Sequence, residues 1–173
     1  MTRKIRQYPT DFGVGTLMES VTNDEVRELG LRFFRGVNYR GVGSIEFKKD
    51  DRDGQYKMIE LNARLWQQNV QATYAGINFP LVQYLDLTGQ PVEPTTRYKL
   101  GVRWFDAIQD FQAYNSLRRN GSLSTIEWVR SWLGSDCYAY FAWDDLKPGW
   151  VNSRYGLKYL KLPLLVLRSW GGR

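Results

Sequence analysis

Two short segments on either side of an acidic turn decide the fold of this chain: Gly41-Val-Gly-Ser-Ile-Glu-Phe-Lys-Lys49 and Gln55-Tyr-Lys-Met-Ile-Glu-Leu-Asn62. Apolar and polar residues alternate in both segments, which is the pattern of strands with one buried face. The stretch between them, Asp50-Asp-Arg-Asp-Gly54, has the composition of a turn. The sequence therefore predicts a β-hairpin over residues 41–62.

The odd and even positions of the apolar and polar residues predict the register of this hairpin. The apolar residues of the two strands fall on odd positions, namely Ile45, Phe47, Ile59 and Leu61. Because side chains alternate between the faces of a strand, matching the apolar faces requires Glu46 to lie opposite an even-numbered residue. The loop must then hold an odd number of residues, so a plain two-residue turn at Asp53-Gly54 is excluded. A five-residue loop over residues 51–55 places Glu46 opposite Glu60, with Asn62 on the same face.

Opposed carboxylates of this kind suggest a bound cation. Two like charges held across a sheet repel by about 1 kcal/mol or more, depending on the local dielectric. Carboxylate and amide oxygens suit Mg²⁺ or Mn²⁺, and the lack of His and Cys partners argues against Zn²⁺ and Cu²⁺. Arg64, just past the second strand, adds a donor fork for a phosphoryl group or a carboxylate. The open alternative is a solvated acidic face balanced by Lys48 and Lys57.

Composition excludes several classes of protein. The chain has 173 residues, enough for one domain with an appendage, and 43% hydrophobic residues indicate a folded core. The absence of His excludes catalytic His dyads and His-based zinc sites. The single cysteine, Cys137, excludes an intrachain disulfide and fits a cytoplasmic setting. The longest aliphatic run, residues 164–167, is far short of a membrane span, and no signal-type segment follows Met1.

The net charge of +6 is concentrated at the two ends of the chain. The basic residues in the first ten and last twenty positions are Arg3, Lys4, Arg6, Arg154, Lys158, Lys161, Arg168 and Arg173, with no acid among them. These ends carry +8, which leaves −2 for residues 11–153. Nucleic acid is therefore an unlikely partner for the body of the protein.

Periodicity predicts the remaining elements. A capping box at residues 22–25 is expected to start a helix that ends before Gly41 and carries an apolar stripe. The other expected helices cover residues 64–75, 80–87, 106–119 and 124–133, and the other expected strands cover residues 3–8, 14–21, 97–105 and 137–143. Residues 90–96, with two prolines, are the expected subdomain boundary.

Several motifs together resemble the ATP-grasp family. Ile45-Glu46-Phe47, followed by Ile59-Glu-Leu-Asn-Ala-Arg64, is similar to the metal-binding hairpin near the end of that fold, as in the carbamoyl-phosphate synthase large subunit and its relatives. Phe12-Gly-Val-Gly-Thr-Leu-Met-Glu-Ser20 and Ala75-Gly-Ile-Asn-Phe-Pro80 resemble the same family, so that the resemblance covers residues 3 to about 90. It is closest to the uncharacterised carbamoyl-phosphate-synthase-like ligases.

The resemblance implies roles for the hairpin residues. Glu46 and Glu60 would hold two Mg²⁺ (or Mn²⁺) ions that bridge the phosphates of ATP, and Asn62 would join the second ion. Arg64 would steady an acyl-phosphate intermediate formed from a carboxylate substrate. Ala63 departs from the proline that is commoner in the family, a tolerable change because the ligands flank it.

The resemblance also implies that part of the enzyme is missing. The family's Gly-rich flap, phosphate-contacting lysines and adenine-binding linker precede the region present in this chain. We therefore expect an α+β fold, with a mostly antiparallel sheet and packed helices, that forms the C-terminal ATP-grasp portion over residues 1–90. Residues 91–173 would be a mixed extension with a basic tail. Such a chain would need the N-terminal half to act as an ATP-dependent carboxylate–amine (or related) ligase.

A second class of function stays open. The basic ends could make the chain a non-catalytic binding module that contacts nucleic acid, a membrane or a partner subunit. The two classes differ in which residues matter: the hairpin carboxylates for the ligase, and the terminal cations for the module.

Overall fold

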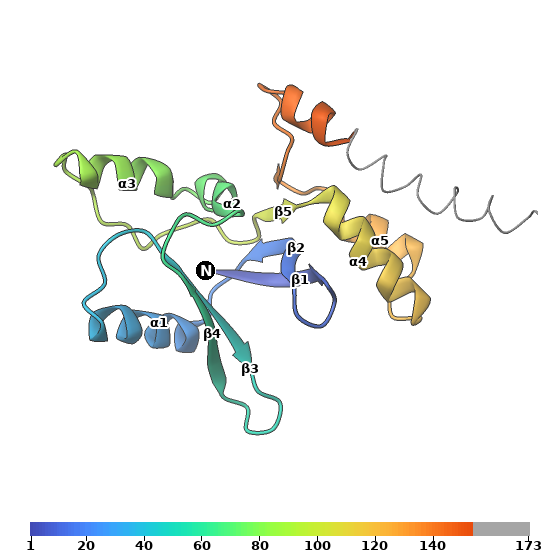
Figure 1. Ribbon diagram of the computed structural model, residues 1–173, viewed down its shortest axis with the longest axis horizontal. Helices are drawn as coiled ribbons and strands as arrows, with labels where there is room; N and C mark the ends of the chain where they lie inside the picture. The colour runs from blue at the N-terminus through green and yellow to red at the C-terminus, as the bar shows by residue number, and fades with distance from the viewer. Residues whose placement is uncertain (154–173) are drawn as a thin grey trace, which may run out of the picture. The chain divides into compact units, whose positions relative to one another are not determined.

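The computed structural model of the chain describes residues 1–153 (Figure 1). The elements along the chain are β1 (Thr2–Tyr8), β2 (Val14–Ser20), α1 (Asp24–Gly36), β3 (Ser44–Lys49), β4 (Tyr56–Asn62), α2 (Asn69–Tyr74), α3 (Phe79–Leu87), β5 (Arg103–Phe105), α4 (Ala107–Arg119), α5 (Thr125–Trp132) and β6 (Cys137–Tyr138). Residues 147–153 are also helical. The fold is α+β, as expected. Within the described part, no helix has the length and apolar content to cross a membrane.

The strands form two separate sheets. One has the order β1-β2-β5-β6 and the other is the β3-β4 hairpin. Strands β5 and β6 are parallel, with Trp104 beside Cys137, so the larger sheet is mixed. Among the described residues, the parallel pair is the one departure from the expected antiparallel arrangement that the strand pairing shows, and it arises because α4 and α5 lie between β5 and β6 in the chain, a crossover connection of the kind that parallel neighbours require.

Two predicted elements are shorter than periodicity suggested. Residues 97–105 alternate like a strand, but only β5 is extended, because Gly101 turns the backbone with a φ of 75°. The predicted helix over residues 64–75 is reduced to α2. A turn that the Asn69 amide closes on the Trp66 carbonyl, at 3.1 Å, replaces its first helical turn.

Helix α1 begins one residue later than the predicted capping box. Its N-cap is Asn23, whose side-chain oxygen accepts a hydrogen bond from the Val26 amide at 3.1 Å. The Asn23 side-chain amide donates to the Tyr56 hydroxyl on β4 at 2.8 Å. The asparagine therefore both caps the helix and fastens it to the hairpin. A capping box does form at α5, between Ser124 and Glu127.

We expect Asn23→Ala to lower the free energy of unfolding by about 1 kcal/mol, because it removes the cap of α1. Asn23→Asp keeps an acceptor for the helix but removes the donor to Tyr56, so a smaller loss is expected. Urea denaturation monitored by circular dichroism would measure both. Equal losses for the two variants would show that the contact with Tyr56, not the cap, is the important one.

The chain divides into two compact units. The first consists of Met1–Arg3 and Glu19–Arg103, and the second of Lys4–Met18 with the chain from Trp104 onward. The first unit contains the β3-β4 hairpin with α1, α2 and α3. The second contains most of β1 and β2 together with β6, α4 and α5. The boundary predicted between residues 90 and 91 concerns the domains of the family that the chain resembles, and it stays a prediction.

The second unit is built around a fully buried carboxylate. Asp110 accepts two hydrogen bonds from Arg6, each at 2.9 Å, one from the Thr16 hydroxyl at 2.8 Å and one from the Trp128 indole at 2.7 Å. Trp128 also stacks on Tyr114, with 4.5 Å between ring centroids. Burial raises the pKa of the Cys137 thiol in this unit to about 12, so the group is a thiol at neutral pH.

Candidate functional site

The hairpin places the two predicted glutamates opposite each other. Glu46 pairs with Glu60, and Ser44 pairs with Asn62 on the same ladder. Opposite residues share a face of the sheet, and so do residues two apart on one strand. Glu46, Glu60 and Asn62 therefore lie on one face, and the register prediction is confirmed.

The route to this register differs from the predicted one. The strands end at Lys49 and begin again at Tyr56, so that the loop covers residues 50–55, an even number. A β-bulge next to Glu46 compensates for the even number of loop residues. Phe47 pairs with Met58, Ile59 is skipped, and Glu46 therefore still pairs with Glu60. Ile59 was expected to share the apolar face with Phe47, and that expectation is wrong. The bulge takes Ile59 out of the ladder and leaves 56% of its side chain exposed.

The turn of the hairpin has its own charge pairs. Asp50 accepts two hydrogen bonds from the Arg52 guanidinium, at 2.9 and 2.7 Å, which together lower its pKa to about 2. The Lys57 ammonium donates to Asp53 at 2.7 Å, and this bond lowers the pKa of that carboxyl. Since Lys57 is held by Asp53, it is a poor balancing charge for the glutamates. Glu46 and Lys48, however, each make a contact of their own, so the alternative of a solvated acidic face balanced by Lys48 stays open.

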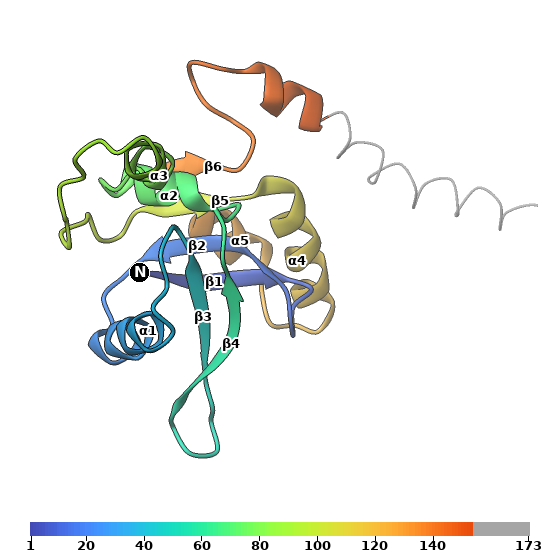
Figure 2. The ribbon, with the colours of Figure 1, turned by 60° about the vertical axis from the view of Figure 1, so that its left-hand side comes forward.

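The opposite face of the hairpin lies against α1 (Figure 2). Leu29, Phe33 and Val37 from the stripe of α1, together with Phe47, Tyr56 and Met58 from the strands, line a groove of about 350 Å³. The predicted apolar stripe therefore does meet the sheet, although more than half of Val37 remains exposed. Because α1 covers this face, the glutamates lie on the face that α1 does not occupy.

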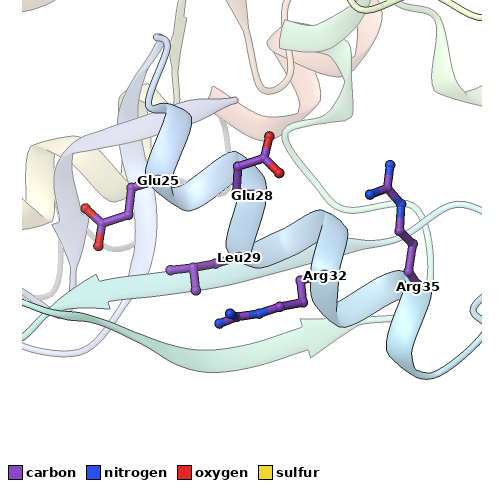
Figure 3. Close-up of a pocket in the computed structure, with 5 residues that line it drawn as sticks. All are labelled: Glu25, Glu28, Leu29, Arg32 and Arg35. Atoms are coloured by element: carbon purple, nitrogen blue, oxygen red, sulfur yellow. The ribbon is translucent and has the colours of Figure 1, made fainter.

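A second depression, of about 490 Å³, surrounds α1 itself (Figure 3). It is lined by Glu25, Glu28, Leu29, Arg32 and Arg35, all from this one helix. In Figure 3, Leu29 and Arg32 point toward the strands while Glu28 and Arg35 point away from them. Side chains that diverge from one helix cannot enclose a ligand, so the depression is a poor candidate for a binding site.

The polar face of the hairpin offers oxygen ligands that are accessible. Glu60 is exposed, while Glu46 and Asn62 are part-buried. The Glu60 carboxylate makes no hydrogen bond or ion pair with residues 1–153. Arg64 is exposed next to this face, and its guanidinium donates to the Leu65 carbonyl at 3.1 Å. Two carboxylates and one amide oxygen fit the preference of Mg²⁺ and Mn²⁺ for oxygen ligands.

This donor set is incomplete for a metal held by protein alone. Among residues 1–153, no group of three or more His, Cys, Asp and Glu side chains could hold a metal ion. Mg²⁺ usually binds through one or two carboxylates, with waters and substrate phosphates completing its shell. The hairpin therefore suits a cation that arrives with a phosphate ligand better than a permanently bound structural ion.

Two comparisons with known proteins bear on this geometry. The family model of the carbamoyl-phosphate synthase L chain, ATP binding domain, matches residues 15–84, which include α1 and the whole hairpin. A D-aspartate ligase of Enterococcus faecium (strain Aus0004) is 28% identical over 72 residues. That match covers 40% of this chain but only 17% of the length of the ligase. The two matches support a relationship of this region to the ATP-grasp family, and the family model describes an ATP binding domain.

Proposed function

We propose that the chain supplies the metal and phosphate ligands of an ATP-dependent carboxylate–amine (or related) ligase and acts with a nucleotide-clamping half. The observation that carries the proposal is the pairing of Glu46 with Glu60 across the hairpin. The match to an ATP-binding domain over the same residues supports it. D-aspartate is the first acid to test as a substrate, because the similar enzyme of Enterococcus faecium is named as a ligase of that acid.

In this proposal each residue of the polar face has a role. Glu46 and Glu60 hold Mg²⁺ (or Mn²⁺), and Asn62 adds an amide oxygen. When bound, the ion supplies positive charge that neutralises the phosphates of ATP. Arg64 orients the phosphoryl group or the carboxylate, because a guanidinium binds either through two parallel hydrogen bonds. A chain without the rest of the clamp would bind the metal weakly and would not hydrolyse ATP.

The alternative of a binding module loses support at its N-terminal end. Arg6 is only 8% exposed and is paired with Asp110 inside the second unit. Arg3 forms an ion pair with Glu19 at 2.9 Å in the first unit. Arg6 is therefore engaged inside the fold, whereas the Arg3 side chain remains 65% exposed beside its partner. The basic residues after position 153 lie outside the described residues.

A thermal-shift experiment tests the metal site in the chain by itself. Without metal, Glu60→Gln is expected to stabilise the chain by about 0.2–1 kcal/mol, because it removes the repulsion from Glu46. With millimolar Mn²⁺, the melting temperature of the parent should rise and that of the variant should not, since only the parent keeps both carboxylates. Glu60→Gln should therefore be more stable than the parent without metal and less stable than the parent with Mn²⁺.

The matched control is Asp51→Asn, which removes the same charge from the turn of the same hairpin. It should leave the Mn²⁺ response of the parent unchanged. An Mn²⁺ response that persists undiminished in the Glu60 variant would refute the proposed ligand pair.

A further inference from the structure

Helix α1 carries its charges in two blocks along one exposed face. Glu25 and Glu28 lie in the first half of the helix, Arg32 and Arg35 lie in the second half, and all four are exposed (Figure 3). Their spacings of three, four and three residues place them on one side of the helix. In the described part of the chain no residue of α1 is buried, so this charged face is open. It encloses no small ligand, but it can meet another protein.

The described part of the chain uses little of this charge. Glu28 pairs with Arg27 at 3.1 Å, whereas the side chains of Glu25, Arg32 and Arg35 make no hydrogen bond or ion pair with residues 1–153. The helix macrodipole favours an acid in the first turn and a base in the last, which accounts for Glu25 and Arg35. Its effect falls off within the terminal turns, so it does not account for Glu28 and Arg32.

The order of the charges is unfavourable within one helix. Glu25 and Glu28 are like charges three residues apart, and so are Arg32 and Arg35, and pairs of this kind destabilise a helix. A partner that carries the same two blocks in the reverse order would replace both repulsions by attractions. A second copy of α1 has that order when it runs antiparallel to the first.

One two-fold axis satisfies all of these charges. With Gly30 at the level of the axis, Glu25 of one copy lies opposite Arg35 of the other, and Glu28 lies opposite Arg32. Both pairs are centred on the same residue, so the two copies form four ion pairs in a single register. Leu31, which is 37% exposed, lies beside the axis and would pack against the other copy.

The charged face adjoins the apolar groove between α1 and the hairpin. Arg32 borders this groove, and two of its apolar lining residues, Val37 and Met58, are 54% and 39% exposed. A second helix beside α1 would cover the rim of the groove and so add apolar burial to the ion pairs. Two helices of 13 residues offer a small interface, and interfaces below about 1,200 Å² belong to transient complexes. The expected association is therefore weak and reversible.

Other occupants fit only part of this face. A nucleic acid would pair with the arginines but would be repelled by the glutamates. A basic peptide would pair with the glutamates alone, and an acidic peptide with the arginines alone. A second copy pairs with both blocks, because the face is complementary to itself.

We propose that α1 forms the two-fold contact of a weak homodimer, in which Glu25 and Glu28 of each copy pair with Arg35 and Arg32 of the other. This interaction goes beyond the proposed ligase function. It does not involve the polar face of the hairpin, which lies on the side that α1 does not occupy.

Sedimentation equilibrium of the full chain tests this contact. At about 0.1 M salt, where the net charges of two copies are largely screened, the parent should dimerise as its concentration rises. The double variant Arg32→Glu with Arg35→Glu should lower the association constant by at least about tenfold, because four attractions become repulsions. Glu25→Lys with Glu28→Lys should lower it by a similar factor for the same reason.

Mixing the two double variants separates this pairing from a general effect of charge. An equimolar mixture should associate at least as strongly as the parent, because all four pairs across the axis again have opposite charges. The matched control, Arg97→Glu with Arg119→Glu, makes the same charge change at exposed residues outside α1 and should dimerise as the parent does.

A disulfide cross-link reports the register without changing the four charges. Leu31→Cys should join two copies on mild oxidation, because residue 31 lies beside the axis. Leu87→Cys, at a more exposed position on α3, should not. The buried Cys137 thiol, whose pKa is raised, should not react in either variant.

Four results would overturn the proposal. They are a parent that stays monomeric up to about 1 mM, dimerisation of both double variants as strong as that of the parent, a mixture that stays monomeric, and cross-linking at residue 87 in preference to residue 31. No variant changes a hairpin carboxylate, so the response to Mn²⁺ tests the ligase proposal separately.

Discussion

With the function proposed above, Glu60→Gln is expected to lower the ATP-dependent activity of this chain combined with a nucleotide-clamping half by at least about 100-fold. The substitution keeps the shape of the side chain but removes one of the two opposed charges that we propose as metal ligands. Losing a residue that only orients a metal ligand typically costs 10- to 100-fold, so loss of a ligand itself should cost more. The measurement is ADP release over a panel of carboxylates, with this chain supplied together with its nucleotide-clamping half.

The controls for this prediction separate metal loss from misfolding. Asp51→Asn, in the same turn, should keep full activity. Raising Mn²⁺ should partly restore the Glu60 variant, because a weakened site fills at higher metal concentration. Arg64→Lys should reduce turnover while leaving the Mn²⁺ response of the chain unchanged. Full ligase activity after loss of both glutamates would end the proposed assignment.

The hairpin shows what the alternation of apolar and polar residues in a sequence can and cannot predict. The strict alternation around Glu46 and Glu60 correctly predicts that they lie opposite each other. The same reasoning is wrong about Ile59 and about the length of the loop. The loop is one residue longer than predicted and a bulge absorbs the extra residue, so the pairing of Glu46 with Glu60 is unchanged. The alternation of one sequence does not show where a bulge inserts its extra residue.

Capping and turns show the same limit at other positions. Thr22 and Asn23 are both good N-caps, and the residue that caps α1 is Asn23, whose side chain also contacts Tyr56, far away in the sequence. The late start of β5 within the strand predicted at 97–105 follows the positive φ of Gly101, which alternation of apolar residues does not report. Local pattern therefore predicted the type of most elements, while tertiary contacts set their ends.

The buried ion pair was missed for a physical reason. Arg3, Lys4 and Arg6 look alike as a basic N-terminal cluster, and nothing in their spacing singles out Arg6. Only the fold shows that its side chain lies inside the second unit against Asp110, which is fully buried. A substitution of the whole cluster would therefore unfold this unit, and could not be used to test binding by its charges.

Asp110→Ala is expected to lower the free energy of unfolding by about 3–5 kcal/mol, the cost of leaving a buried charge without its partner. The loss should be large because Arg6, Thr16 and Trp128 all donate to this one carboxylate. Urea denaturation followed by tryptophan fluorescence would measure it. A loss below about 1 kcal/mol would mean that water reaches Arg6 when the carboxylate is removed.

The double variant Arg6→Met with Asp110→Leu distinguishes the charge from the packing. Replacing both members of a buried ion pair by apolar residues of similar volume is often neutral or stabilising, so the double variant should be more stable than Asp110→Ala. The Thr16 hydroxyl and the Trp128 indole would still lose their acceptor, which should cost on the order of 1 kcal/mol each. A double variant as unstable as the single one would show that those two hydrogen bonds, more than the paired charges, hold the second unit together.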